Sequence, residues 1–163
     1  MLKMTLFDFH NTVDISEWRI INDVVMGGVS KSEFLLNNSG YGIFKGSVSL
    51  EKNGGFSMVK YSFPEKEIQS FSKIKILLKG DLKNYQVRIK ADTSIDYSYV
   101  KGITTSDNWE EIEIKLTDFT PTYRGKQLNI PNFHETKISE IAFLIGNKKA
   151  ESFQLHLGKI ELL

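Results

Sequence analysis

The sequence contains no cysteine, three histidines and three prolines among its 163 residues. The absence of cysteine excludes disulfide bonds, thiolate metal sites and cysteine nucleophiles. The histidines, His10, His134 and His156, are far apart and lack the short spacing that zinc-binding pairs have. We therefore expect neither a metal ion nor a cofactor.

An excess of one charge and long apolar runs are lacking too. The 21 basic and 20 acidic side chains give a formal net charge of +1, whereas nucleic-acid binding requires a net basic surface. The longest apolar run, Ile141–Ile145, is far too short to span a membrane. Asp8 interrupts the N-terminal segment before a signal peptide could form, and no transit peptide is recognisable. We expect no nucleic acid partner, no transmembrane segment and a bacterial-type cytoplasmic protein that reaches a membrane only through a partner.

What the sequence does contain is apolar residues at every second position of short segments, for example in residues 85–91, 111–116 and 153–157. This period is typical of strands with one face in a core and the other in water. Turn-forming Asn, Asp and Gly separate the segments, and amphipathic helical stretches are almost absent. The pattern predicts an all-β fold, an antiparallel β-sandwich or jelly roll, forming a single domain over residues 1–163.

Two segments depart from this alternation. The apolar positions change phase beside Gly158, which predicts a β-bulge there. Residues 118–134 show no clean alternation and hold Pro121 and Pro131. We expect a long loop there, either functional or anchored to the body of the protein.

No motif of a known catalytic chemistry is complete. Gly27 and Gly28 have the spacing of neither a P-loop nor a dinucleotide-binding loop, so a tight turn or close backbone crossing is the favoured interpretation. A G-x-S-x-G segment is absent, and nothing selects a second carboxylate to act with Asp23. We therefore expect a protein that is not an enzyme.

Three segments resemble the motifs of one family, in the same order. Trp18 and residues 22–30, Asn-Asp-Val-Val-Met-Gly-Gly-Val-Ser, are similar to the signature W-x3-N-D-x-V-M-G-G-x-S. Residues 50–56 and 118–125 resemble the motifs L-x-x-N-G-G-F and D-F-x-P-T-x-R-G. The chain thus resembles the CIA30 family, which includes the complex I intermediate-associated protein 30, an assembly factor for NADH:ubiquinone oxidoreductase.

The resemblance implies a galactose-binding-like jelly roll and a non-enzymatic, chaperone-like role in complex I assembly. One departure is Leu82, which follows Asp81 where the family usually has another glycine. The motif residues that we expect to shape the fold are Trp18, Gly27, Gly28, Asn53, Gly54, Gly55, Trp109, Pro121 and Gly125.

The first functional hypothesis is a protein-interaction module that binds respiratory complex subunits or assembly intermediates. Its surface would be two loops, residues 24–30 and 119–125, that meet at one end of the sandwich. The residues expected to contact the partner are Asn22, Asp23, Met26, Tyr123 and Arg124. An alternative for Asp23 and Arg124 is a buried ion pair that pins the two loops together.

The second hypothesis is a binding module for carbohydrate or another small ligand. Tyrosines beside basic and polar residues can stack on sugar rings, whereas packing at sheet rims is an equally supported alternative. The expected site is a concave sheet face lined by Tyr85, Arg88, Tyr97 and Tyr99.

Overall fold

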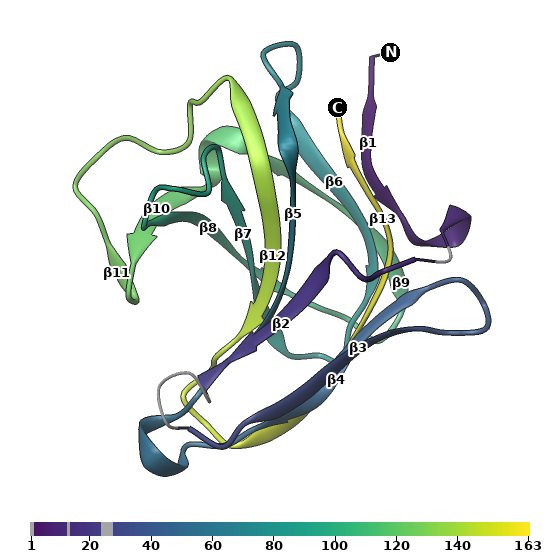
Figure 1. Cartoon of the computed structure of the whole chain (residues 1–163), viewed down its shortest axis with the longest axis vertical. Helices are drawn as coiled ribbons and strands as arrows, with labels where there is room; N and C mark the ends of the chain where they lie inside the picture. The colour runs from purple at the N-terminus through teal and green to yellow at the C-terminus, as the bar shows by residue number, and fades with distance from the viewer. Residues whose placement is uncertain (1, 13, 24–27) are drawn as a thin grey trace.

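The alternating segments of the sequence form two antiparallel sheets that pack face to face (Figure 1). The structure is a computed structural model that describes residues 2–12, 14–23 and 28–163. Its strands are β1 (Met4–Asp8), β2 (Trp18–Asn22), β3 (Lys31–Leu36), β4 (Gly42–Val48), β5 (Ser57–Glu67), β6 (Lys73–Lys79), β7 (Asn84–Lys90), β8 (Ser98–Thr104), β9 (Trp109–Lys115), β10 (Thr120–Tyr123), β11 (Lys126–Gln127), β12 (Lys137–Ile145) and β13 (Glu151–Leu162). Short 3₁₀ helices lie at Phe9–Asn11, Glu51–Asn53 and Leu116–Asp118.

The first and last strands, β1 and β13, both belong to the same one of the two sheets. The six-stranded sheet has the order β3-β4-β13-β6-β9, and β1 also pairs with β13. The seven-stranded sheet has the order β11-β10-β8-β7-β12-β5-β2. This arrangement confirms the all-β, two-sheet sandwich that the alternation predicts. None of the described helices is long and apolar enough to cross a membrane.

The core lies between the sheets, where the apolar side of each strand faces the other sheet. On β6, for example, Ile74, Ile76 and Leu78 are fully buried, while Lys75 and Leu77 between them are half-buried. Each such side chain contributes roughly 1.5–3 kcal/mol to folding when it leaves water. At one end of the core Trp18 stacks on Tyr61 with ring centroids 5.1 Å apart and packs edge to face against Phe7. Trp18 is therefore a core residue.

The two predicted irregularities have different outcomes. The bulge beside Gly158 is confirmed, because the pairing of β13 with β6 changes register between Leu157 and Lys159. The long loop over residues 118–134 is wrong in part, because β10 and β11 form a hairpin within it. The proline at position 121 makes β10 hard to recognise as a strand from the sequence. In the structure Pro121 is buried and lies opposite Tyr99 of β8.

Candidate binding surfaces

Asp23 holds together the backbone around the end of β2. Its buried carboxylate, 1% exposed, accepts hydrogen bonds from the backbone N–H of Ser30 at 2.9 Å, of Gly55 at 2.6 Å and of Phe56 at 3.3 Å. The Ser30 hydroxyl also donates to it. These donors come from segments before β3 and before β5, so one side chain ties three parts of the chain together.

Two glycines are needed because this carboxylate lies so close. A Cβ on Gly28 would lie 2.4 Å from Cγ of Asp23, and a Cβ on Gly54 would lie 2.5 Å from its Oδ2. Gly55 next to it has φ +148°, which favours glycine. The motif glycines of residues 50–56 thus accommodate Asp23, and the backbone of Asn53 belongs to the preceding 3₁₀ helix.

The pKa of Asp23 reflects the same contacts. Burial opposes its ionisation, but the hydrogen bonds from Ser30, Gly55 and Phe56 together outweigh burial and lower the pKa below its usual value. The group is therefore an ionised acceptor whose lone pairs are used by the protein's own backbone. Asn22, the residue before it, pairs with Ser57 at the end of β2.

Tyr123 and Arg124 lie elsewhere, at the turn between β10 and β11. Both are exposed, and Cζ of Arg124 lies 5.3 Å from the centroid of the Tyr123 ring, a cation–π distance. Gly125 completes the turn with φ +80°.

The ion pair between Asp23 and Arg124 does not form. β2 and β10–β11 are at opposite edges of the seven-stranded sheet, separated by β8, β7, β12 and β5. Asp23 therefore lies at the edge of the sheet opposite the hairpin, and the prediction that Asp23 and Arg124 come together was wrong. Met26 and Gly27 lie outside the described residues.

The tyrosines predicted to line a ligand face point into the core instead. Tyr85 is 2% exposed and donates its hydroxyl hydrogen to Asp81, and Tyr99 is buried edge to face against Phe133. Tyr97 packs against Tyr99. Tyr85 and Arg88 are separated by an odd number of positions on one strand, so they cannot share a face, and the prediction that grouped them was wrong.

Arg88 lies on the side of the seven-stranded sheet that is turned away from the core, which we call the outer face. Both Nε and Nη2 of Arg88 donate to Oε1 of Gln86, at 3.0 and 2.9 Å. Burial lowers the pKa of Arg88, although the nearby charge of Glu140 opposes this shift. The guanidinium is thus partly desolvated and fixed in orientation.

Glu140 of β12 extends the polar part of the outer face. It is itself buried, accepts a hydrogen bond from Ser62 at 3.3 Å and forms an ion pair with Lys60 at 3.7 Å. The sequence analysis did not select Gln86, Glu140 or Lys60 as site residues. Glu140 is the one charged residue within the mainly apolar segment 138–145, and a charge in such a segment indicates a candidate functional residue.

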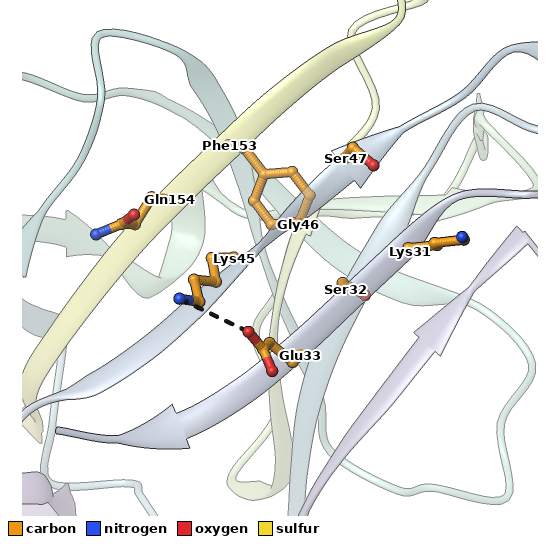
Figure 2. Close-up of a pocket in the computed structure, with 8 residues that line it drawn as sticks. All are labelled: Lys31, Ser32, Glu33, Lys45, Gly46, Ser47, Phe153 and Gln154. Carbon is orange, nitrogen blue, oxygen red and sulfur yellow. Dashed lines mark ion pairs between the residues drawn. The ribbon is translucent and has the colours of Figure 1, made fainter.

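The outer face ends in a cavity of about 290 Å³ at the ends of β7, β8 and β12. Gln86 lines this cavity as well as holding Arg88. A shallow hollow of about 500 Å³ lies on the other sheet, over β3, β4 and β13 (Figure 2). In Figure 2 Lys45 lies between Gln154 and Glu33, and it forms an ion pair with Glu33 at 3.6 Å. Within the described part of the chain, no three acidic or histidine side chains are grouped so that they could hold a metal ion.

Comparison with known families identifies this two-sheet protein. The family model for the complex I intermediate-associated protein 30 (CIA30) matches residues 7–157. The chain belongs to the CIA30 family. The match spans the Asp23 region, the β10–β11 hairpin and nearly all strands of this CIA30 protein. A search of curated protein sequences finds no match.

Solved structures with the same fold include carbohydrate-binding modules. A family 11 module from a cellulosomal cellulase, Lic26A-Cel5E of Clostridium thermocellum, has a TM-score of 0.72 and 19% sequence identity, covering 99% of the CIA30 chain and 94% of its own. The family 11 module in complex with a β-1,3-1,4-mixed-linked tetrasaccharide has the same score and identity, with 99% and 95% coverage. The agarase AgWH50C matches with a TM-score of 0.64 and 14% identity over 98% of this chain and 24% of its own. At these identities the likeness is one of fold.

Proposed function

We propose that this CIA30 protein is a non-enzymatic module that binds a protein partner through the outer face and the adjoining β10–β11 hairpin. The observation that carries the proposal is the Arg88–Gln86 pair beside buried Glu140 on the outer face. Desolvating charged side chains outside the core costs free energy, and fixing them in one orientation prepares a surface for a complementary ligand.

The composition of the outer face favours a protein over a sugar at this place. Sugar sites use aromatic rings as stacking surfaces. By register, the described residues of the central strands that point to this side include no aromatic ring. They are Met58, Lys60, Ser62, Asn84, Gln86, Arg88, Lys90, Ser98, Val100, Gly102, Thr104, Glu140, Ala142 and Leu144. Met58 and Arg88 belong to residue types that are enriched in protein interfaces.

The hairpin extends the proposed binding surface around the edge of the seven-stranded sheet. Tyr123 and Arg124 are two residues of the kinds that contribute most to protein interfaces, and Tyr123 is 37% exposed. Thr120 and Thr122 lie opposite Val100 and Ser98 of β8, so the outer face continues onto β10, whereas Tyr123 lies on the side of Pro121 and borders this face at the exposed edge of the sheet. The family's description supports the class of partner, namely subunits or intermediates of respiratory complex I.

The decisive experiment is affinity capture from detergent-solubilised membranes of the source organism. We expect the wild-type protein to retain complex I subunits and the Tyr123→Ala protein to lose them, with a melting temperature within about 2 °C of wild type because the ring lies outside the core. Arg88→Lys keeps the charge but removes the planar donor pair, so we expect it to weaken capture as well.

Trp109→Ala is the matched control, because Trp109 is an exposed aromatic residue on the other sheet. It should capture the same subunits as wild type. Equal retention by the Tyr123→Ala and wild-type proteins, or retention of no respiratory subunit by either, would contradict the proposal.

A further inference from the structure

Trp109, one of the expected motif residues, is not a core residue. It is the first residue of β9 and is 37% exposed, whereas Trp18, the other tryptophan, is buried. Across the six-stranded sheet, Trp109 lies opposite Lys79 of β6, Lys79 opposite His156 of β13, and His156 opposite Ile43 of β4. This row points away from the core, because the neighbouring residues on each side of His156 are fully buried.

The indole of Trp109 extends over the bulge of β13. A Cβ added to Gly158 would lie 3.5 Å from the indole, an ordinary van der Waals distance, so the indole lies beside the backbone of the bulge. The ring of Tyr41 approaches the indole to 4.4 Å between centroids, tilted by 41°, and the centroid of the His156 ring lies 6.1 Å from that of the indole. Tyr41, Trp109 and His156 thus form a continuous aromatic surface, which we call the aromatic platform.

Polar groups border the platform on the side of the hollow in Figure 2. The amide Nε2 of Gln154, which lines the hollow, lies 3.3 Å from Nε2 of His156. Burial, and then the charge of Lys79, lower the pKa of His156, so the ring is neutral near neutral pH and accepts this hydrogen bond. The hollow continues from Gln154 to Lys45 and Glu33 (Figure 2). Donors and acceptors therefore line one edge of an exposed aromatic surface.

We infer that the aromatic platform and the hollow form a binding site for a saccharide chain. A sugar ring presents an apolar face of C–H groups, which stacks on an indole, and a rim of hydroxyl groups, which need donors and acceptors at its side. The platform supplies the first, and Gln154, Lys45 and Glu33 supply the second. The site is open and shallow, as an extended chain requires, and lies on the sheet opposite the proposed protein surface, on which it does not depend.

Native affinity electrophoresis tests the site with soluble polysaccharides as probes: mixed-linkage β-glucan, xylan, galactomannan, polygalacturonate and alginate. We expect at least one of them to retard the wild-type protein. Trp109→Ala should weaken that binding by about tenfold or more, because it removes the stacking surface. Gln154→Ala should weaken it too, and Trp109→Phe should restore part of the retardation. Tyr123→Ala should be retarded like wild type.

Tryptophan fluorescence gives an independent readout, because the chain has two tryptophans and Trp18 is buried. The retarding polysaccharide should protect Trp109 from acrylamide quenching while the Trp18 signal stays constant, and the Trp18 signal also reports that each variant is folded. The inference is overturned if none of the five probes retards the protein, or if the folded Trp109→Ala protein is retarded as strongly as wild type.

Discussion

At the scale of single residues, Asp23 shows how a polar motif residue can serve the backbone. Its carboxylate is occupied by donors from Ser30, Gly55 and Phe56, and no cation lies against it among the described residues. Arg124, its predicted ion-pair partner, is exposed at the opposite edge of the sheet. Substitution of Asp23 should therefore destabilise the protein strongly, whereas substitution of Arg124 should have little effect on its stability.

We expect Asp23→Asn to lower the free energy of unfolding by about 2–4 kcal/mol, because the amide turns N–H groups toward backbone donors and leaves them unsatisfied. Arg124→Ala should change it by less than about 0.5 kcal/mol. Urea denaturation at neutral pH measures both values. Similar large losses in the two variants would restore the ion-pair interpretation.

The pH dependence of the unfolding free energy, compared between wild type and the Asp23→Asn protein, gives a second check on the role of Asp23. Its pKa is lowered in the folded state from the ordinary value of 3.8. As the pH falls below about 4, the unfolded chain takes up the proton first, so the stabilisation from Asp23 is present at higher pH and is lost in acid. The difference in unfolding free energy between wild type and Asp23→Asn should therefore shrink as the solution is acidified.

At the scale of elements, the turn between β6 and β7 explains the departure at Leu82. Leu82 has φ +69°, a conformation that favours glycine, and its side chain is 69% exposed. The turn is held by Asp81, whose carboxylate accepts from the Tyr85 hydroxyl at 3.1 Å and from the backbone N–H of Gln154 at 2.8 Å. The family's usual glycine fits this backbone without strain.

We expect Leu82→Gly to raise the free energy of unfolding by up to about 1 kcal/mol, since relief of the left-handed strain exceeds the added entropy of the unfolded chain. Leu82→Ala keeps the strained φ and should give no such gain. Thermal unfolding of the three proteins compares them, and a glycine variant less stable than the alanine variant would show that the side chain makes a needed contact.

Local patterns predicted the sheets but not the positions of the strands within them. Alternation along 85–90 and 153–157 correctly indicated strands with one buried face, because burial acts on every second residue. Applied strictly, the same alternation separates Tyr85 from Arg88 and selects Gln86 and Arg88 for the outer face. The separation of Asp23 from Arg124 depends on which strands are at the edges, and that order is set by long-range pairing that no local segment encodes.

At the scale of the whole molecule, two packed sheets give the protein two outer surfaces with different chemistry. Fixed charges and the β10–β11 hairpin belong to the seven-stranded sheet, whereas the aromatic platform belongs to the six-stranded sheet. The core separates them, so neither ligand should exclude the other.

We therefore expect capture of complex I subunits to be unchanged when a polysaccharide that retards the protein is added at saturation. Repeating the capture with and without the polysaccharide measures this directly. Release of the subunits by the polysaccharide would mean that both ligands use one surface.

The position of β13 has a consequence for synthesis. Glu151–Leu157 of this strand pair with β4, Lys159–Leu162 pair with β1, and β6 lies along its other side, so the central strand of the six-stranded sheet comes last in the sequence. While a ribosome extends the chain, β4 and β6 cannot yet pair with β13. The edges of these two strands that face β13 therefore stay unpaired until residue 162 has left the exit tunnel. The sheet that carries the aromatic platform is thus completed only when β13 has left the exit tunnel, and until then the unpaired edges of β4 and β6 are prone to pair with a wrong strand.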